Sequence, residues 1–438
     1  MARPRRSGIV ALLLLTNLVG CGKSSTGPRP HVPAPQDYYV AFPANLDLTR
    51  DAALSLKITG VPATDGTVTV PGQGYAVAFT TDAAGLATVT LPDTVMLNAW
   101  DSVMARGVIV HTDDDATVLA ISDKPGSMHP AAPFPATALG LHYRVMSAGG
   151  GSAVRGSFLA LVGTQDLTTV TIQPTANAGT HTATVPFQVT LDRGDAYQLE
   201  ATDSLGDLTG TDVLADKPIA AFGGHILGQV PPLTGFAGLL WTALPPASAV
   251  TGATFLAFPF NHRTGYRLRV LGLQNGTNLS ASGISGLATT LNAGQLSEAR
   301  TTTAASITTS QPVLVAQLAE GNSADTVSGA DPCFTLLPPV SGFQTTYLFA
   351  PPTNQVGTLR VNLVVPASAT GTITVNGAPV SSGGFTPIGA SGYSGQSVTL
   401  TAPVNTIASS GASFGAVVYG WDAPGGYNGF CFAPRAGY

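Results

Sequence analysis

The chain has 438 residues, of which 44% are hydrophobic and only 10% charged, with 51 glycines and 33 prolines. This length allows several domains, and the apolar content is typical of a folded chain. The formal net charge is −5 and no basic patch follows the N-terminal segment, which argues against a nucleic acid partner because phosphate binding needs clustered Lys and Arg.

The first residues have the pattern of an export signal. Three arginines precede an apolar run at 9–15, and the small residues Val19 and Gly20 come just before Cys21. The sequence around Cys21 resembles the lipobox of bacterial lipoproteins, which implies a signal peptide over 1–20 and acylation of Cys21. A plain secretory signal is the alternative; a transmembrane helix is disfavoured because the run is too short to span a bilayer.

Acylation would tether the protein to a membrane of the bacterial cell envelope, facing the surface or the periplasm, and to the outer membrane if there are two membranes. Stable anchoring needs more than one acyl chain, which the lipoprotein resemblance implies. Residues 21–37 are rich in Pro and Ser and predict an extended spacer between the lipid and the folded body.

The rest of the chain predicts β-strands throughout. Short alternating segments at 67–70, 88–91 and 108–110 are rich in β-branched residues and bounded by Gly, Pro and Asp. No apolar stripe with helical spacing persists beyond about two turns after the signal. The expected fold is therefore all-β and antiparallel.

A loose fourfold theme divides the chain into β units at 38–128, 129–246, 247–338 and 339–438. Each unit opens with an aromatic strand, continues with a Thr-rich strand and closes with an apolar strand. The closing strands are 115–119, 217–221, 311–315 and 413–418. Six to eight strands fit in each unit, which favours a two-sheet sandwich; a propeller-like arrangement of the four units is the alternative. Proline-rich seams suggest sandwiches strung end to end.

Two cysteines remain besides Cys21. In an exported protein Cys333 and Cys431 are expected to form a disulfide rather than remain free. The alternative, a nucleophilic cysteine, lacks a nearby histidine in the sequence.

A distinctive string of residues lies in the second unit. The motif residues are Asp207, Leu208, Thr209, Gly210, Thr211, Lys217, Pro218, Phe222, Gly223, Gly224 and His225. This string resembles the N-terminal domain of the IgGFc-binding protein family, and the likeness runs from about Tyr39 to the region of Asp331 and more faintly to the C-terminus. The resemblance implies an adhesive or ligand-binding module displayed outside the cell and not an enzyme, and it supplies no binding residues. A structural role is also open, because glycines permit turns and Asp and Thr can cap them.

Catalytic and cofactor patterns are weak, and we predict no catalytic residue, metal or cofactor. The seven histidines lack metal-ligand spacing, and the run 113–115 lacks the Gly pattern of a calcium loop. Ser285 and Ser394 lack the glycine spacing of an esterase elbow. A glycosidase uses a pair of carboxylates. The chain has three glutamates, Glu200, Glu298 and Glu320, and aspartates could also do that work.

Two classes of function stay open at this point. The first is a lipid-anchored, non-catalytic surface module that recognises an extracellular protein or glycan, with a structural scaffold of the envelope as its variant. The second is an extracellular hydrolase, which would require paired carboxylates in a cleft.

Overall fold

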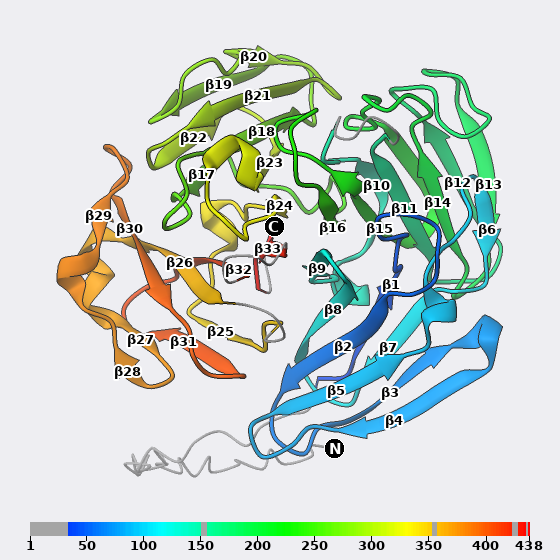
Figure 1. Ribbon diagram of the computed structural model, residues 1–438, viewed down its shortest axis with the longest axis horizontal. Helices are drawn as coiled ribbons and strands as arrows, with labels where there is room; N and C mark the ends of the chain where they lie inside the picture. Colours follow the sequence, from blue (N-terminus) through cyan, green and yellow to red (C-terminus); the bar gives the residue numbers. More distant parts are fainter. Residues whose placement is uncertain (1–33, 150–155, 353–356, 423–427, 435–436) are drawn as a thin grey trace, which may run out of the picture. The chain divides into compact units, whose positions relative to one another are not determined.

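The computed structural model describes residues 34–149, 156–352, 357–422, 428–434 and 437–438, and residues 34–438 form one compact unit. The all-β, antiparallel fold that the sequence predicts is confirmed (Figure 1). The expected signal peptide, Cys21 and most of the spacer lie outside the described residues. No helix within the described part of the chain has the length and apolar character needed to cross a bilayer.

Four sandwiches follow one another along the chain, each with eight strand positions in the same topology; in the second sandwich the single strand β15 fills two of these positions. Numbered within a sandwich, strands 1-6-3-4 form the first sheet and strands 5-2-7-8 the second sheet. In the first sandwich the first sheet is β1 (Gln36–Val40), β7 (Val108–Thr112), β3 (Asp65–Val70) and β4 (Tyr75–Thr80). Its second sheet is β5 (Leu86–Leu91), β2 (Ala53–Gly60), β8 (Ala116–Lys124) and β9 (Ser127–Ala131).

The second sandwich has one long strand, β15 (Asp212–Gly228), that serves both sheets. Its N-terminal part pairs with β10 (Gly140–Arg144) and with β12 (Thr168–Gln173), which pairs with β13 (Phe187–Leu191). Its C-terminal part pairs with β11 (Phe158–Gly163) and β16 (Gly238–Leu244), and β14 (Ala196–Glu200) pairs with β11. The short strand β6 (Ser102–Met104) extends this second sheet at β14.

The third and fourth sandwiches repeat the order. The third consists of β17 (Thr254–Ala257), β22 (Ala305–Thr309), β19 (Thr277–Ser282) and β20 (Thr290–Leu291), then β21 (Leu296–Thr301), β18 (Tyr266–Gly272), β23 (Val313–Ala319) and β24 (Cys333–Leu336). The fourth consists of β25 (Thr346–Phe349), β31 (Asn405–Ser409), β27 (Ile373–Val375) and β28 (Ala378–Pro379), then β30 (Tyr393–Thr399), β26 (Thr358–Pro366), β32 (Gly415–Trp421) and β33 (Gly429–Phe432), with β29 (Thr386–Pro387) added beside β30.

Helical segments are short. They are α1 (Asn322–Asp325) and the 3-10 turns Pro71–Gln73, Asp93–Val95, Ala136–Ala138, Val340–Gly342, Ala367–Thr372 and Ser382–Gly384. The expected boundary between residues 128 and 129 falls inside β9, which pairs with β8 and so belongs with the first sandwich. Each unit has two sheets of at least four strands rather than the single four-stranded sheet of a propeller blade.

The second sheet of each sandwich is buried on both faces. In β11, Leu159 and Leu161 pack into the core of their own sandwich, while Phe158, Ala160 and Val162 pack against the first sandwich. The seventh strands of the other sandwiches also send alternate side chains into two different cores. Val118 and Ala120 of β8, Val313 and Val315 of β23, and Ala416 and Val418 of β32 pack into the core of their own sandwich. Leu119 and Ile121, Leu314 and Ala316, and Val417 and Tyr419 pack against the neighbouring sandwich. Every large hydrophobic cluster therefore joins two neighbouring sandwiches.

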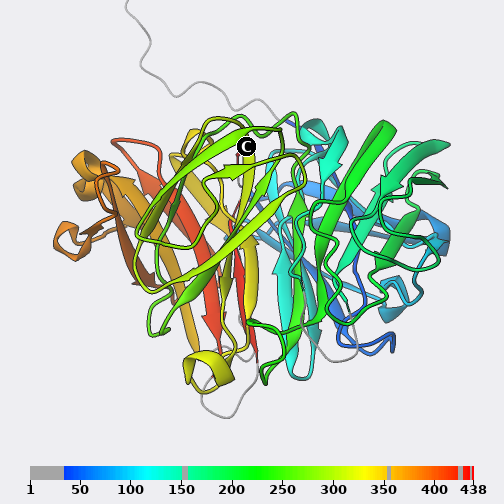
Figure 2. The ribbon, with the colours of Figure 1, turned by 90° about the horizontal axis from the view of Figure 1, so that it is seen from above.

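The eighth strands complete this arrangement by contacting one another. β9 contacts β16, β16 contacts β24, β24 contacts β33, and β33 contacts β9, so the fourth sandwich returns to the first (Figures 1 and 2). We call these four strands the central strands. The expectation of sandwiches strung end to end is wrong: the central strands are buried almost throughout, so their free edges and apolar faces must be covered by other sandwiches.

Specific bonds hold the central strands together. The indole N–H of Trp241 donates to the carbonyl oxygen of His129 at 3.2 Å, and the backbone N–H of Phe334 donates to His129 Nε2 at 3.3 Å. A disulfide joins Cys333 in β24 to Cys431 in β33, with a Cα–Cα distance of 5.5 Å and a sequence separation of 98 residues. On the chain-entropy model, a crosslink over such a loop stabilises the fold by about 4 kcal/mol.

The pH dependence of stability should report on the buried His129. Burial lowers the pKa of His129 to about 4, so the folded state binds this proton less well than the unfolded state, in which the pKa is 6.5. The free energy of unfolding should therefore fall as the pH drops from 6.5 towards 4, by up to about 3 kcal/mol from this residue. Urea unfolding at pH 7.5, 5.5 and 4.5 measures it. The His129→Gln variant should lose stability less steeply, and equal slopes for the two proteins would contradict the assignment.

Candidate functional site

The motif residues 207–211 form a tight turn ahead of β15. Asp207 Oδ1 accepts the backbone N–H of Thr209 at 2.9 Å, and Gly210 has a φ of +93°. An aspartate carboxylate that accepts the backbone N–H two residues later favours a tight turn. Glycine adopts a positive φ without strain. Leu208 between them is fully buried, which fixes the turn to the core of the second sandwich.

Hydroxyl groups tie this turn to the strands around it. Thr209 Oγ1 accepts the N–H of Ser147 and donates to the carbonyl oxygen of Ser147, both at 3.1 Å. Ser157 Oγ accepts the N–H of Leu208 at 2.7 Å, and Thr211 Oγ1 accepts the N–H of Thr175 at 3.2 Å. These bonds satisfy backbone groups that would otherwise be buried without partners.

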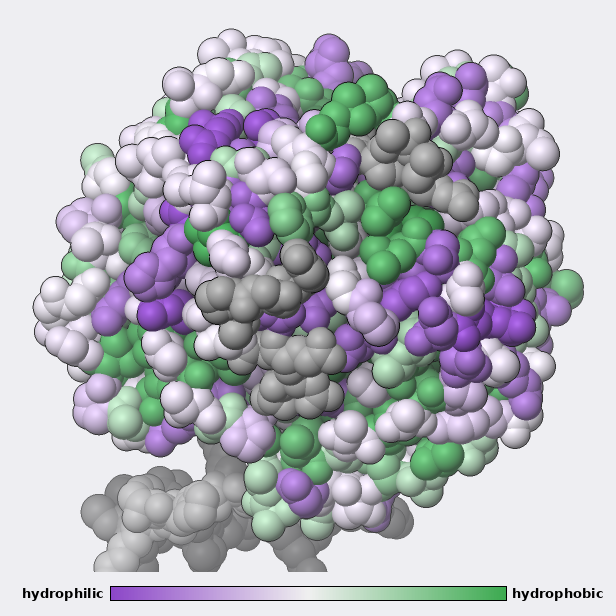
Figure 3. All heavy atoms as spheres, viewed as in Figure 1, coloured by the Kyte–Doolittle hydropathy of each residue, from purple (hydrophilic) through white to green (hydrophobic). Residues whose placement is uncertain are grey.

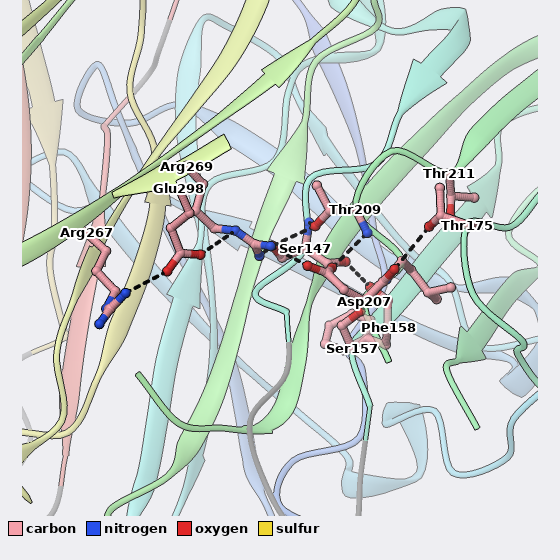
Figure 4. A network of polar contacts seen from close by, with 11 residues as sticks. Ser147, Ser157, Phe158, Thr175, Asp207, Thr209, Thr211, Arg267, Arg269 and Glu298 are labelled. Atoms are coloured by element: carbon pink, nitrogen blue, oxygen red, sulfur yellow. Dashed lines mark hydrogen bonds and ion pairs between the residues drawn. The ribbon is translucent and has the colours of Figure 1, made fainter. Parts of the chain in front are cut away.

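The turn also binds the third sandwich through Arg269 of β18. The guanidinium of Arg269 pairs with Asp207 Oδ2 and donates to the carbonyl oxygen of Ser147, while its Nε lies 3.1 Å from Glu298 Oε2 (Figure 4). Arg269 is only 2% exposed, so its charge must be satisfied by these partners. We call the pair Asp207–Arg269 the inter-sandwich clasp.

A ladder of ion pairs continues from the clasp across the third sandwich. Glu298 Oε1 lies 3.0 Å from Arg267 Nη1, and Arg267 Nε lies 3.2 Å from Glu320 Oε1. Arg300 Nε reaches Glu320 Oε2 at 2.8 Å. Because Arg269 stands opposite Glu298 in the pairing of β18 and β21, the strand register itself builds part of this ladder.

The electrostatics of Asp207 follow from these contacts. Burial opposes the ionised form of Asp207, but the charge of Arg269 and the hydrogen bonds from Thr209 outweigh it, and the pKa of Asp207 lies below its ordinary value. The carboxylate is therefore ionised at neutral pH, and the clasp is a charged pair.

The backbone of the turn also approaches the third sandwich closely. A Cβ atom added at Gly210 would collide with the carbonyl oxygen of Gly294, so a side chain at position 210 would push the two sandwiches apart. Arg144 donates to the carbonyl oxygen of Gly210 at 3.1 Å and covers the same junction. Glycine is required here for both conformation and space.

The second part of the motif lies in β15 and is structural in the same sense. Lys217 Nζ donates to the carbonyl oxygens of Asp166 and Leu167, and Pro218 stands where β15 passes from the first sheet to the second. A proline fits such a corner because its position there needs no ladder donor. Phe222 stacks on Trp241 with ring centroids 5.8 Å apart.

Gly223, Gly224 and His225 complete the motif inside the second sheet. Added Cβ atoms would collide with the carbonyl oxygen of Met146 at Gly223 and with that of Leu240 at Gly224. His225 is fully buried, and its Nδ1 accepts the N–H of Leu227 at 3.1 Å. Most motif residues are thus buried against other protein groups, which supports the structural interpretation.

The histidines do not gather into one site. His111 lies between Asp37 at 2.7 Å and Asp113 at 3.2 Å, and His142 and His181 each contact a single aspartate, Asp212 and Asp101. His31 is outside the described residues. Within the described ranges, no group of three or more His, Cys, Asp or Glu side chains is placed to hold a metal ion.

The serine and glutamate candidates are also scattered. Ser285 is exposed between β19 and β20, and Ser394 lies inside β30, so neither stands on a strand-to-helix elbow. Glu298 and Glu320 are held by arginines in the ion-pair ladder, whereas Glu200 belongs to β14. The three glutamates do not form an isolated pair facing a cleft.

Sequence reasoning missed the partners of the motif. Arg269 and Glu298 lie 62 and 91 residues after Asp207, with no local signal for the pairing. A weak signal was present in the Arg-x-Arg pattern of β18 and the Glu-x-Arg pattern of β21, which place charges on one face of adjacent strands where apolar residues would be expected.

The fold and the motif define a tandem β-sandwich protein without a recognisable catalytic centre in its described part. The family model described as IgGFc binding protein matches residues 132–420, which is more than half of the chain. The chain belongs to this family, as the motif resemblance predicted. The matched part begins after β9, later than the expected start near Tyr39, and it ends within β32, in the C-terminal part where a fainter likeness was expected.

Two solved structures align with most of this chain at low TM-scores. One is a tetra-tandem repeat in the extending region of a large adhesion protein, with 14% identity, 91% of this chain and 98% of that chain covered, and a TM-score of 0.11. The other is a Ca2+-stabilized adhesin that helps an Antarctic bacterium bind ice, with 10% identity, the same coverage and a TM-score of 0.12. No curated protein matches the chain.

Breaking the inter-sandwich clasp should destabilise the whole body. Asp207→Asn keeps the shape and the turn-capping oxygen but removes the charge that satisfies Arg269, so the free energy of unfolding should fall by about 2–3 kcal/mol at pH 7. The difference from the parent protein should shrink as the pH falls below the ordinary Asp pKa of 3.8 towards the lower pKa of folded Asp207, because protonation of Asp207 removes its charge in the parent protein as well. Denaturant unfolding measures both. The matched change Asp216→Asn, at an exposed position of β15 whose Oδ1 accepts the N–H of Thr169, should cost no more than about 0.5 kcal/mol. Equal effects of the two substitutions would contradict the clasp.

The crowded glycine in β15 should tolerate no side chain. Gly224→Ala places a methyl group against the backbone of Leu240 and Trp241, and overpacking of this kind costs about 1–3 kcal/mol or more. The control is Gly371→Ala, since a Cβ there has nothing within 4 Å. We expect a large fall in melting temperature for Gly224→Ala alone; unchanged melting of that variant would show that the strands are less tightly packed than described.

Proposed function

We propose that this protein is a non-catalytic binding or adhesion module of the bacterial cell envelope, anchored by lipid at Cys21, that recognises an extracellular protein or glycan. Membership of the IgGFc binding protein family carries the proposal. The family's name refers to antibody Fc, and the proposal for this chain is the broader class of extracellular ligand.

The architecture supports a binding role. Four sandwiches joined through shared cores and the central strands make one body, and a rigid scaffold lowers the entropic cost of presenting loops to a partner. The face seen in Figure 3 mixes polar and apolar residues, which suits recognition of a specific ligand better than broad hydrophobic association.

The chemistry of the described residues supports a role without catalysis. Two of the three glutamates are held by arginines, and the motif residues stabilise the fold. A hydrolase would need a nucleophile or paired carboxylates free to meet a substrate.

Anchoring and binding can be tested together in cells. The full chain should incorporate labelled fatty acid and fractionate with membranes, whereas Cys21→Ser should do neither, because the acylated thiol is lost. Cells that display the parent protein should bind immobilised mucin-type glycoproteins or neighbouring-cell extracts more strongly than cells lacking it. Membrane association of Cys21→Ser equal to that of the parent would overturn the anchor.

The binding half of the proposal has its own contrary outcomes. Failure to bind any protein or glycan in such screens would contradict it. Crosslinking in intact cells only to other envelope proteins would instead identify a scaffold.

A further inference from the structure

A cavity of about 190 Å3 lies where all four sandwiches meet. It is found at the end of the central strands: residues that follow β9 line it, together with the last residues of β16, β24 and β33. β1 and the turn before β8 close one side, and Tyr438 closes another. No single sandwich could form this cavity, since each contributes only part of its wall.

The polar groups of the wall carry little charge. Thr117, Thr242 and Thr335 supply hydroxyl groups, Gln36 an amide, and Asp115 a carboxylate. No Lys, Arg or His is among the described residues that line the cavity. An anionic ligand would therefore lose its hydration without gaining a cationic partner, and it would lie near the carboxylate of Asp115.

Aromatic rings provide the apolar part of the wall. Phe134 and Tyr438 meet edge to face with ring centroids 5.7 Å apart, and Phe432 also lines the cavity. The hydroxyl group of Tyr438 is buried, and it hydrogen-bonds to no other residue in the described part of the chain. A buried hydroxyl group without a partner is costly, and a polar ligand in the cavity would supply one.

We propose that this cavity binds one neutral sugar ring, such as the terminal residue of an uncharged glycan. A pyranose has C–H faces that pack on aromatic rings and hydroxyl groups that exchange hydrogen bonds with Thr, Gln and Asp side chains. The volume is below the range of about 300–1,000 Å3 typical of sites for drug-sized ligands, which suits a single ring. The inference deepens the proposed binding function and rests on it.

An organic cation is the main competing ligand. Asp115 could pair with an amine, and aromatic rings attract cations. We favour the neutral sugar because hydroxyl and amide groups outnumber the single carboxylate in the wall. Binding of choline in place of sugars would therefore overturn the proposal.

Ligand-detected NMR on the full chain in detergent tests the site. The probes are glucose, galactose, mannose, fucose, N-acetylglucosamine and N-acetylgalactosamine, with choline and sialic acid as the charged comparisons. At least one neutral sugar should bind with a millimolar or tighter dissociation constant, whereas the free sialic acid monosaccharide should not bind. Absence of binding by every neutral sugar would overturn the proposal.

Matched variants place the binding in the cavity. Thr242→Val and Asp115→Asn should each weaken the sugar at least tenfold, because they remove a hydroxyl group and a carboxylate with little change of shape. Thr88→Val, on the exposed side of β5, and Asp113→Asn, two residues from Asp115 but outside the cavity, should leave the affinity unchanged. Thermal melting checks that all four variants fold. Equal affinities in cavity and control variants would place the sugar elsewhere and overturn the assignment.

The outcome for the cavity is separable from that for the proposed function. If cells displaying Thr242→Val and Asp115→Asn variants still bind glycoproteins as the parent does, the module binds its ligand through another surface and this inference fails alone. Loss of binding by every form of the protein would instead count against the proposed function.

Discussion

The double burial of the second sheets is the constraint on which the rest of the structure depends. A sandwich alone would expose the outer face of its second sheet, whose strands present apolar side chains on both sides. Each such face is covered by the neighbouring sandwich, and the fourth covers the first. Burial of apolar surface stabilises a fold by about 25 cal/mol per Å2. Because neighbouring sandwiches share this buried surface, the stability of each depends on the other, unlike that of independent domains on a string.

The family motif has a clear place within this constraint. Its first part, residues 207–211, forms the turn that binds Arg269 of the third sandwich. Its second part lies in β15, where neighbouring backbone leaves no space for side chains at Gly223 and Gly224. These residues set the junction between two sandwiches rather than a ligand site. The binding that we propose would then use surfaces that the motif does not occupy, such as the cavity at the end of the central strands.

Much of the fold could be predicted from local patterns, because alternation and turn residues act over a few positions. The strands at 67–70 and 88–91, the four units and the β-sandwich class follow from such patterns. The neighbour relations could not be predicted so directly. The continuous apolar run at 313–316 is typical of a strand buried on both faces, and it was the available signal that each sandwich needs a second partner. Which partner covers the run depends on contacts with residues far away in the sequence. Arg269 lies 62 residues after Asp207, so no local pattern pointed to their pairing, and none pointed to the cavity, whose wall draws on all four sandwiches.

Cooperativity of unfolding tests the shared-core account most directly. Trp241 is buried in the core between the first and second sandwiches, and Trp421 in that between the third and fourth, so tryptophan fluorescence reports on both sides of the body and far-UV circular dichroism on all strands. The account predicts one denaturant transition with coincident midpoints for the two probes and a slope appropriate to the whole folded body. Two or more separate transitions, with sandwiches melting independently, would contradict it.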